Sequence, residues 1–465
     1  MKKNIKIFLF SLIFVWIAVA ATVFWFSKQK DLPQKQEIII NKNEKITPCG
    51  DGICDLLEKK DARLCPQDCV NSVVNNVVKN NITQEDVVSH FGFLNAYGPS
   101  MAKLSEKWES NFNKDLIETS SDLMKDISAG WSREFVFIYP SDYKDSYSLE
   151  RFKKAKENGT KLIITVGVEE RQMNDIKYEE WLAGILEYYS GYVKYWQVHN
   201  EIGSSRRFPR VDSYITLLKE TSGLIKGGCS DCKIMMSSFA PDTSSDYYGD
   251  VIKKGSSYVD AYDFHIFNEE QMSVFKNFVS KVDKPVFVTE MATYSGDPAE
   301  TKNVYQSETQ QAEKLIKWYV QAFDIGADYV FWSQFIEWYE FFGKVDGMFD
   351  FTGLVYNGMC LSKNTGNVCG DILVDKGNGV KKEAYYSLKT LIAKVDGFTA
   401  VKKIKEGQYE FVVNEKSVYV LWCDNDNCSL SGEVRGATSI VDYRGEKIGT
   451  SLEKVKLSSS PIFAY

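Results

Sequence analysis

From about residue 89 onward, short apolar segments alternate with longer segments in which apolar residues recur every three or four positions. The short segments are typical of buried strands, and the longer ones of amphipathic helices. Eight strands are predicted: Phe91–Ala96, Phe135–Tyr139, Lys161–Val166, Val193–His199, Lys233–Ser237, Ala261–Phe267, Val286–Thr289 and Tyr329–Trp332. Repeated strand–helix units predict parallel strands covered by helices.

The helical segments carry continuous apolar faces. One such face consists of Ala312, Leu315, Ile316, Tyr319 and Phe323. Ser307 and Gln310 precede it with the spacing of a capping box, and Gly326 follows it as a stop signal. Eight units spanning about 300 residues predict an α/β fold of the (β/α)8 or TIM barrel type over residues 88–397. A doubly wound sheet is the alternative, but it usually has fewer strands and a nucleotide-binding loop, and the sequence has no such motif.

After Val395 the apolar period changes from that of helices to that of strands. The predicted strands are Tyr409–Val413, Ser417–Trp422, Ser439–Tyr443 and Ile462–Tyr465. We expect residues 398–465 to form a small all-β domain, a sandwich packed against the barrel. Such a domain can bind carbohydrate or brace the barrel.

The N-terminal region predicts a membrane anchor. Residues 7–26 carry no charge and follow three lysines within residues 1–6, which would form a cytoplasmic tail. A run of about 20 apolar residues spans a bilayer as a single transmembrane helix. The remainder of this single-pass protein would then lie outside the cytoplasm, with residues 27–48 as a linker. A cleaved signal peptide, giving a secreted protein, is the alternative.

Ten cysteines fall into close groups. They are Cys49, Cys54, Cys65 and Cys69; Cys229 and Cys232; Cys360 and Cys369; Cys423 and Cys428. An even number in close pairs favours disulfides formed in an oxidising compartment, and the looser spacing of the first four makes a zinc site the weaker alternative. Residues 49–69 therefore predict a small cysteine-rich module, followed by a linker over residues 70–87.

Acidic residues within this cysteine-rich module raise the question of calcium. They are Asp51, Asp55, Glu58 and Asp68. Carboxylate oxygens are suitable calcium ligands, although solvated acids in a tight loop are the simpler interpretation.

The composition excludes several functional classes. The net charge is −7, and no basic patch interleaved with aromatic residues is present, so a nucleic-acid partner is not expected. The three histidines, His90, His199 and His265, show no paired metal spacing. We therefore predict neither a catalytic metal nor a cofactor.

Polar residues at the ends of the predicted strands define a candidate site. Glu201 and Glu290 follow the fourth and seventh strands, which lie across a barrel from one another. The other candidates at the same end are Tyr97, Arg133, Asn200, His265 and Trp332. Two carboxylates facing one cavity are the minimum equipment for cleaving a glycosidic bond.

In their order along the chain, these motifs resemble those of the clan A glycoside hydrolases. The matching segments are Ala129–Arg133, Trp196–Glu201, Tyr262–His265, Lys284–Glu290, Phe331–Trp332 and Ala384–Lys389. The layout is most similar to family 39 and to related family 5 enzymes. The resemblance implies that Glu201 is the general acid/base, that Glu290 is the nucleophile and that Asn200 binds the sugar 2-hydroxyl. Arg133 would keep Glu290 ionised, and Trp332 would form a stacking floor for the sugar.

Two positions depart from the family pattern. Ile202 stands where the family often has proline, and Phe267 stands where a tyrosine usually contacts the nucleophile. Tyr262 is an alternative source of that hydroxyl. For its role as an acid, we expect burial and the charge of Glu290 to raise the pKa of Glu201.

Two functions are compatible with the sequence. The first is a membrane-anchored retaining glycoside hydrolase acting on an extracytoplasmic oligo- or polysaccharide. The second is a catalytically inactive barrel that binds glycans at the cell surface. The presence of both glutamates favours the first, whereas Ile202 and Phe267 slightly favour the second.

Overall fold

The computed structural model describes nine segments of the chain. They are residues 89–98, 111–144, 146–173, 175–204, 207–298, 304–337, 347–358, 376–425 and 428–465. The predicted cytoplasmic tail, transmembrane helix, linkers and cysteine-rich module with its calcium ligands lie outside these residues, as do Cys360 and Cys369. Among the residues described, no helix combines the length and apolar character needed to span a bilayer.

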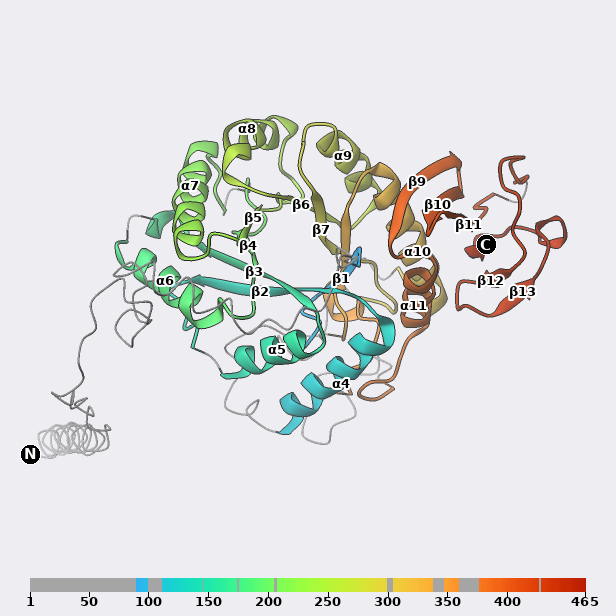
Figure 1. Ribbon diagram of the computed structural model, residues 1–465, viewed down its shortest axis with the longest axis horizontal. Helices are drawn as coiled ribbons and strands as arrows, with labels where there is room; N and C mark the ends of the chain where they lie inside the picture. Colours follow the sequence, from blue (N-terminus) through green and yellow to red (C-terminus); the bar gives the residue numbers. More distant parts are fainter. Residues whose placement is uncertain are drawn as a thin grey trace, which may run out of the picture. The chain divides into compact units, whose positions relative to one another are not determined.

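Eight parallel strands form a nearly closed barrel (Figure 1). They are β1 (Phe91–Leu94), β2 (Trp131–Tyr139), β3 (Lys161–Val168), β4 (Tyr195–Val198), β5 (Lys233–Met236), β6 (Tyr262–Ile266), β7 (Val286–Met291) and β8 (Tyr329–Trp332). Each pairs with its sequence neighbours except β5 with β6, and β1 also pairs with β8. Between β5 and β6 the ring closes through a single bridge from Met235 to Ala261. The predicted TIM barrel is confirmed.

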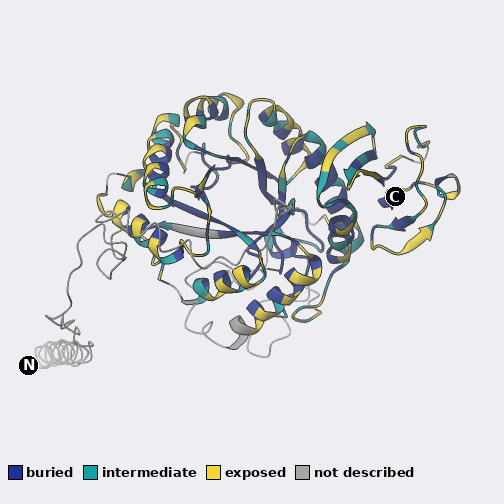
Figure 2. Ribbon diagram, in the orientation of Figure 1, coloured by how far each residue is buried: buried dark blue, intermediate teal, exposed yellow. Residues whose placement is uncertain are grey.

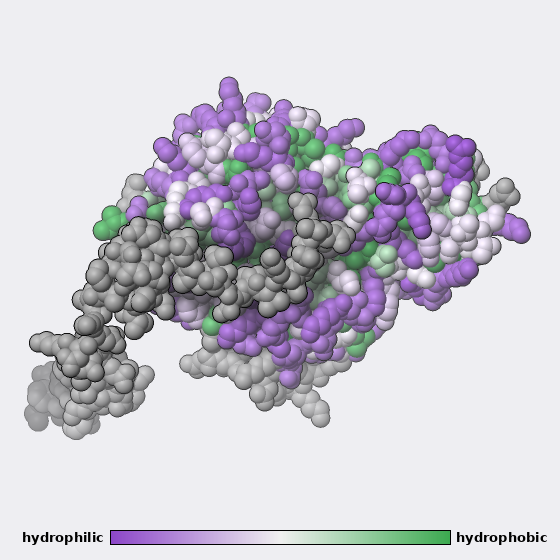
Figure 3. All heavy atoms as spheres, in the orientation of Figure 1, coloured by the Kyte–Doolittle hydropathy of each residue, from purple (hydrophilic) through white to green (hydrophobic). Residues whose placement is uncertain are grey.

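Helices surround the barrel (Figure 1). They are α4 (Asn111–Ile127), α5 (Ser146–Glu157), α6 (Lys177–Tyr189), α7 (Val211–Gly228), α8 (Ser245–Gly255), α9 (Glu269–Val279), α10 (Glu308–Ile325) and α11 (Glu383–Val395). Their buried faces point to the strands in Figure 2, and the described surface in Figure 3 is largely hydrophilic. The predicted capping box at Ser307 and Gln310 opens α10, and Gly326 ends it with a φ of 122°.

Strand β2 begins at Trp131, earlier than the predicted start at Phe135. The intervening residues are polar, which hid the strand in the sequence, but each has a buried partner. Glu134 forms an ion pair with Arg151 of α5 on the outer face of the barrel, and Arg133 points into the barrel. Pairing offsets the cost of burying these charges.

An apolar layer fills the N-terminal end of the barrel interior. Its members are Trp131, Ile163, Met235, Ala261, Phe287 and Phe331. The polar interior residues lie above this layer, toward the C-terminal ends of the strands. The barrel is therefore a packed core at one end, and its chemistry is restricted to the other.

The C-terminal domain is a single six-stranded antiparallel sheet, so the predicted sandwich is wrong. The strands are β9 (Phe398–Lys405), β10 (Gln408–Val413), β11 (Lys416–Leu421), β12 (Ile440–Asp442), β13 (Lys447–Gly449) and β14 (Ile462–Ala464). One face packs on the barrel helices through residues such as Phe411 and Val420. Leu452 and Leu457, which lie outside the strands, cover the other face and replace the expected second sheet. Lysine-rich β9 has no buried residue, and the apolar pattern therefore missed it.

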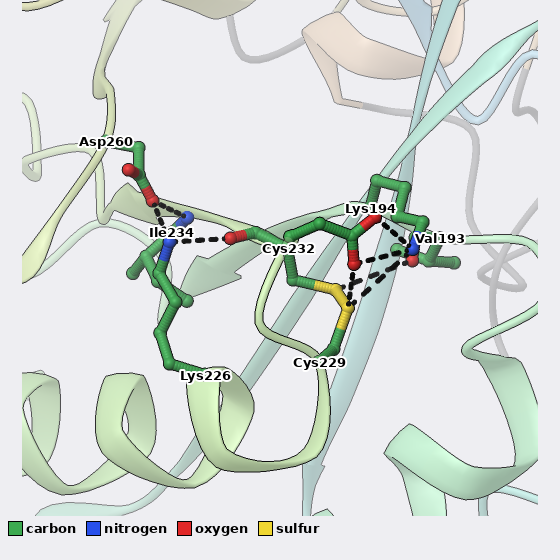
Figure 4. The surroundings of a disulfide bond; sticks show 8 residues. Val193, Lys194, Lys226, Cys229, Cys232, Ile234 and Asp260 are labelled. Carbon is green, nitrogen blue, oxygen red and sulfur yellow. Dashed lines mark hydrogen bonds and ion pairs between the residues drawn. A yellow bond between two sulfur atoms is a disulfide. The ribbon is translucent and has the colours of Figure 1, made fainter. Parts of the chain in front are cut away.

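Two of the predicted disulfides are present, Cys229–Cys232 and Cys423–Cys428. The first links the end of α7 to the start of β5 (Figure 4). Beside it, the Lys226 ammonium donates to the Cys232 carbonyl at 2.7 Å and to Asp260 at 2.8 Å. The Cys229–Cys232 disulfide lies at the N-terminal end of the barrel, opposite the polar residues of the interior.

Candidate active site

A bulge in β7 directs Glu290 into the barrel. Along this strand Phe287 points inward and Val288 points to the helices. The pairing with both neighbouring strands then shifts by one residue between Val288 and Glu290 or Met291. As a result, Thr289 and Glu290 both face the interior, whereas strict alternation would place Glu290 among the helices.

Arg133 of β2 holds the Glu290 carboxylate. Its Nη1 lies 2.6 Å from Glu290 Oε1, and the two side chains are 0% and 9% exposed. The rest of the guanidinium is also fixed, because Nε donates to Gln197 at 2.8 Å and Nη2 donates to Asn200 Oδ1 at 2.7 Å. A buried cation with three fixed contacts fixes the orientation of a neighbouring carboxylate.

The chain turns sharply where β4 ends. His199 and Glu201 have φ values of 70° and 50°, a left-handed conformation that is uncommon for residues other than glycine. Glu201 is held there by a hydrogen bond from its backbone N–H to Ser238 Oγ at 3.2 Å. Such strained residues cluster at functional sites, where the surrounding structure fixes them. The turn brings the Asn200 and Glu201 side chains to the mouth of the barrel.

His265 of β6 lies between the two glutamates. Its Nδ1 is 3.3 Å from Glu201 Oε1, and its Nε2 is 3.6 Å from Glu290 Oε1. One nitrogen of His265 and one oxygen of each glutamate lie within 4.8 Å of one another. Glu201 also contacts Arg207 Nη1 at 3.1 Å, and its side chain is 25% exposed. The two carboxylates therefore meet at one point, and Glu201 is the more accessible.

The charges around His265 and Glu201 set their protonation. Burial lowers the pKa of His265, but the negative charges of Glu290 and Asp263 and hydrogen bonds to Asp263 and Glu201 outweigh it and raise that pKa to about 10. Burial would raise the pKa of Glu201, but His265, Arg207 and Arg133 together hold it below its usual range. The prediction that the pKa of Glu201 is raised is therefore wrong, because the effect of these cations outweighs that of burial.

A polar network beneath the glutamates supports them. Asp263 accepts from Gln197 Nε2, from the Thr289 backbone N–H at 3.0 Å and from the Thr289 hydroxyl at 2.7 Å. Gln197 Oε1 in turn accepts from Arg133. These residues were not among those predicted for the site, although polar side chains inside apolar strands were a signal for them. Arg207 was not predicted either, because its loop position carries no such signal.

Three residues proposed for the site lie elsewhere. Tyr97 is fully buried, with its hydroxyl 2.7 Å from Thr160 Oγ1, so it does not line the mouth of the barrel. Tyr262 faces the helices, and its hydroxyl lies 3.4 Å from Asp283.

The third residue, Trp332, is also fully buried. It follows inward-facing Phe331 and therefore points outward, where it stacks against Tyr319 of α10. Its indole N–H donates to the Thr352 carbonyl at 2.8 Å. Trp332 is therefore not a stacking floor for a sugar.

Glu201, His265 and Glu290 have the spacing of a possible cation site. Their surroundings do not suit one, because Arg133 already neutralises Glu290 and His265 binds a proton strongly. The other candidate, Cys229, Asp231 and Cys232, includes two sulfurs that are joined in a disulfide.

Two solved structures illustrate the comparisons with known proteins, and the first of them supports the fold. A family 39 glycoside hydrolase from Bacteroides cellulosilyticus has a TM-score of 0.55 and 12% identity over 81% of this chain and 80% of its own. An α-L-arabinofuranosidase from Thermotoga maritima has a TM-score of 0.48 and 10% identity over 82% and 98%.

The sequence comparisons identify no family that covers the barrel. The family described as "RET, Cysteine Rich Domain" matches residues 23–101, which include the cysteine-rich segment. A search among curated proteins gave no match. By its barrel and its attached antiparallel sheet, the chain has the fold of glycoside hydrolases.

Proposed function

We propose that this protein is a retaining glycoside hydrolase. The observation that carries the proposal is the approach of Glu201 and Glu290, with carboxylate oxygens within 4.8 Å of each other around His265. Retaining enzymes hold their carboxyl groups about 5 Å apart, whereas inverting enzymes leave about 6.5–9.5 Å for a water molecule. The Glu201–Glu290 spacing supports the retaining mechanism.

In the first step, a Glu290 oxygen attacks the anomeric carbon while the bond from that carbon to the leaving oxygen breaks. Glu201 gives its proton to the leaving oxygen, and a glycosyl ester on Glu290 results. Arg133 fixes the attacking carboxylate. In the second step, Glu201 accepts a proton from water, the water oxygen attacks the same carbon, and Glu290 departs.

His265 supplies a source for the proton that Glu201 must donate. The imidazolium Nδ1 lies 3.3 Å from Glu201 Oε1. Transfer of a proton between them gives a neutral imidazole and a protonated Glu201 without changing the net charge of the site. The two groups thus share protons as a coupled pair.

Asn200 would bind the sugar beside these groups. Its Oδ1 accepts from Arg133 Nη2 at 2.7 Å and from Ser238 Oγ at 3.2 Å. These contacts orient the amide so that its NH2 group serves as the donor to a sugar hydroxyl. We place the substrate outside the cytoplasm, on the basis of the predicted N-terminal anchor.

Activated aryl glycosides of several sugars test the proposal. Glu290→Gln should abolish turnover, and Glu290→Ala should regain activity with azide by forming a glycosyl azide of inverted configuration. Glu269→Gln, at an exposed position in the first turn of α9, is the matched control and should remain fully active. Wild-type turnover that survives in Glu290→Gln would reject the assignment.

A second candidate is a glycan-binding protein without hydrolytic activity. The observation that favours it is the low pKa of Glu201, which Arg207 helps to keep ionised. Binding on a glycan array without hydrolysis of any bound glycan would support this candidate. Release of reducing sugar from a bound glycan would exclude it.

A further inference from the structure

Arg207 contacts the proposed acid/base residue directly. Its Nη1 lies 3.1 Å from Glu201 Oε2, and its side chain is 42% exposed. The other oxygen of the same carboxylate, Oε1, faces His265, which lies between Glu201 and Glu290. Because the two contacts use different oxygens, Arg207 stands on the side of Glu201 that His265 and Glu290 do not occupy.

This position corresponds to the departing part of a substrate. Glu290 must reach the anomeric carbon of the sugar that stays on the enzyme, and Glu201 must reach the leaving oxygen. A group beyond Glu201, on the side away from Glu290, therefore meets whatever is attached to that oxygen. Arg207 occupies this place with a positive charge.

One edge of the Arg207 guanidinium carries two donors that are available to a ligand. Nη1 contacts Glu201, whereas Nε and Nη2 form no hydrogen bond with any residue that the structure describes. On this edge of an arginine, two parallel N–H bonds match the two oxygens of a carboxylate. The nearby Arg210 shows the contrast, because its Nε and Nη2 both contact Glu170, at 3.1 and 2.8 Å.

The backbone that carries Arg207 is fixed. Its N–H donates to the Ser204 carbonyl at 3.2 Å, and its carbonyl accepts from the Gly203 N–H at 2.9 Å. The next residue, Phe208, is buried, with its ring centroid 4.9 Å from that of His199. A cation on a fixed backbone is preorganised, which lowers the entropic cost of binding a ligand.

Without a ligand, the charge of Arg207 opposes the proposed reaction. Together with His265, it holds the pKa of Glu201 below its usual range against the effect of burial, although an acid catalyst must carry a proton. A negative charge bound to Arg207 would offset its effect on Glu201. An anionic substrate would therefore raise the pKa of Glu201 as it binds, which a neutral substrate could not do.

We infer that the Nε–Nη2 edge of Arg207 binds a carboxylate on the leaving part of the substrate, such as that of a uronic acid residue. The inference rests on the proposed glycosidase activity and adds the charge of its substrate, an acidic rather than a neutral saccharide. One guanidinium then contacts both the substrate and Glu201, so substrate recognition and protonation of the acid are linked.

Two aryl glycosides of one sugar test the inference. They are the 3-carboxyphenyl and 3-carbamoylphenyl glycosides, whose leaving groups differ in charge but hardly in size; the sugar is one whose 4-nitrophenyl glycoside the wild type cleaves. We expect kcat/KM to be about five- to tenfold higher for the carboxylate, the effect of one charged contact that stays partly exposed. High salt should reduce this preference, because it screens exposed charges.

Variants of Arg207 assign the preference to its guanidinium. Arg207→Gln should reduce the preference to less than about twofold, and Arg207→Lys, which keeps the charge but loses the planar edge, should retain part of it. Arg210→Gln is the matched control and should retain the full preference, because Arg210 is already paired with Glu170. Circular dichroism shows whether each variant is folded.

The pH profiles separate carboxylate binding from a purely structural role of Arg207. In the wild type, the alkaline limb of kcat should lie at higher pH for the carboxyphenyl than for the carbamoylphenyl glycoside, because the bound carboxylate offsets the charge beside Glu201. In Arg207→Gln, the two limbs should coincide.

Equal kcat/KM values on the two glycosides, or a preference for the carboxylate that survives in Arg207→Gln, overturn the inference and leave the proposed hydrolase intact. A wild-type protein that cleaves no 4-nitrophenyl glycoside of any sugar tested rejects the proposed hydrolase and the inference with it.

Discussion

Arg133 and Glu290 form a buried ion pair with 2.6 Å between Nη1 and Oε1, although 157 positions separate them in the sequence. Arg133 also contacts Gln197 and Asn200 through its other nitrogens. One guanidinium therefore links strands β2, β4 and β7. The orientation of the proposed nucleophile depends on this planar group.

Replacing Arg133 by lysine tests this dependence. Lysine keeps the charge but cannot make three contacts in fixed directions. We expect kcat/KM to fall about hundredfold through misplacement of Glu290. Steady-state kinetics with an activated aryl glycoside measure it, and circular dichroism confirms folding. Activity close to that of the wild type would show that charge alone is sufficient.

Arg207 should influence the pH dependence of the reaction. Its guanidinium contributes to the lowered pKa of Glu201, so Arg207→Gln should raise that pKa. Because the acid must be protonated, the alkaline limb of the kcat/KM profile should move to higher pH. Arg210→Gln, which removes an exposed arginine paired with Glu170, is the control and should leave the limb in place. A shift to lower pH would contradict the electrostatic explanation.

Trp332 should contribute to stability rather than to sugar binding. Trp332→Phe removes the indole hydrogen bond to Thr352 and part of a buried ring, and we expect the free energy of unfolding to fall by about 1–3 kcal/mol. Gln311 still holds the Thr352 carbonyl, so kcat/KM should stay within about threefold of the wild type. Urea unfolding and kinetics measure the two quantities. A large loss of activity at unchanged stability would show that Trp332 contributes to substrate binding after all.

Chelation should not inhibit the enzyme. Arg133 and His265 already balance the charges of Glu201 and Glu290 at the one carboxylate cluster of the described site. Incubation with EDTA and dialysis should leave kcat unchanged, and divalent metals added afterwards should not increase it. A loss of activity that zinc or calcium restores would place a cation among Glu201, His265 and Glu290.

The sequence predicted the barrel and the meeting of Glu201 with Glu290, because buried strands and the polar residues that end them leave a local pattern. It could not predict which face Trp332 occupies, since that depends on the position of Phe331 within the finished ring. The pKa of Glu201 was mispredicted for a related reason. Arg207 and His265 reach that carboxyl only through tertiary structure.

The second sheet expected in the C-terminal domain illustrates another limit. A strand with one apolar face shows that the face is covered, but not by what. Here loop residues such as Leu452 and Leu457 provide the cover.

The bulge in β7 gives the local pairing of that strand a chemical meaning. If the same residues paired without the bulge, strict alternation after Phe287 would turn the Glu290 carboxylate outward, beyond the reach of Arg133. A relative could thus keep every acidic and basic side chain of the site and still be inert through the loss of this irregularity alone. When barrels of this kind are compared, the pairing of the strand between Phe287 and Glu290 has to match as well as the identity of its residues.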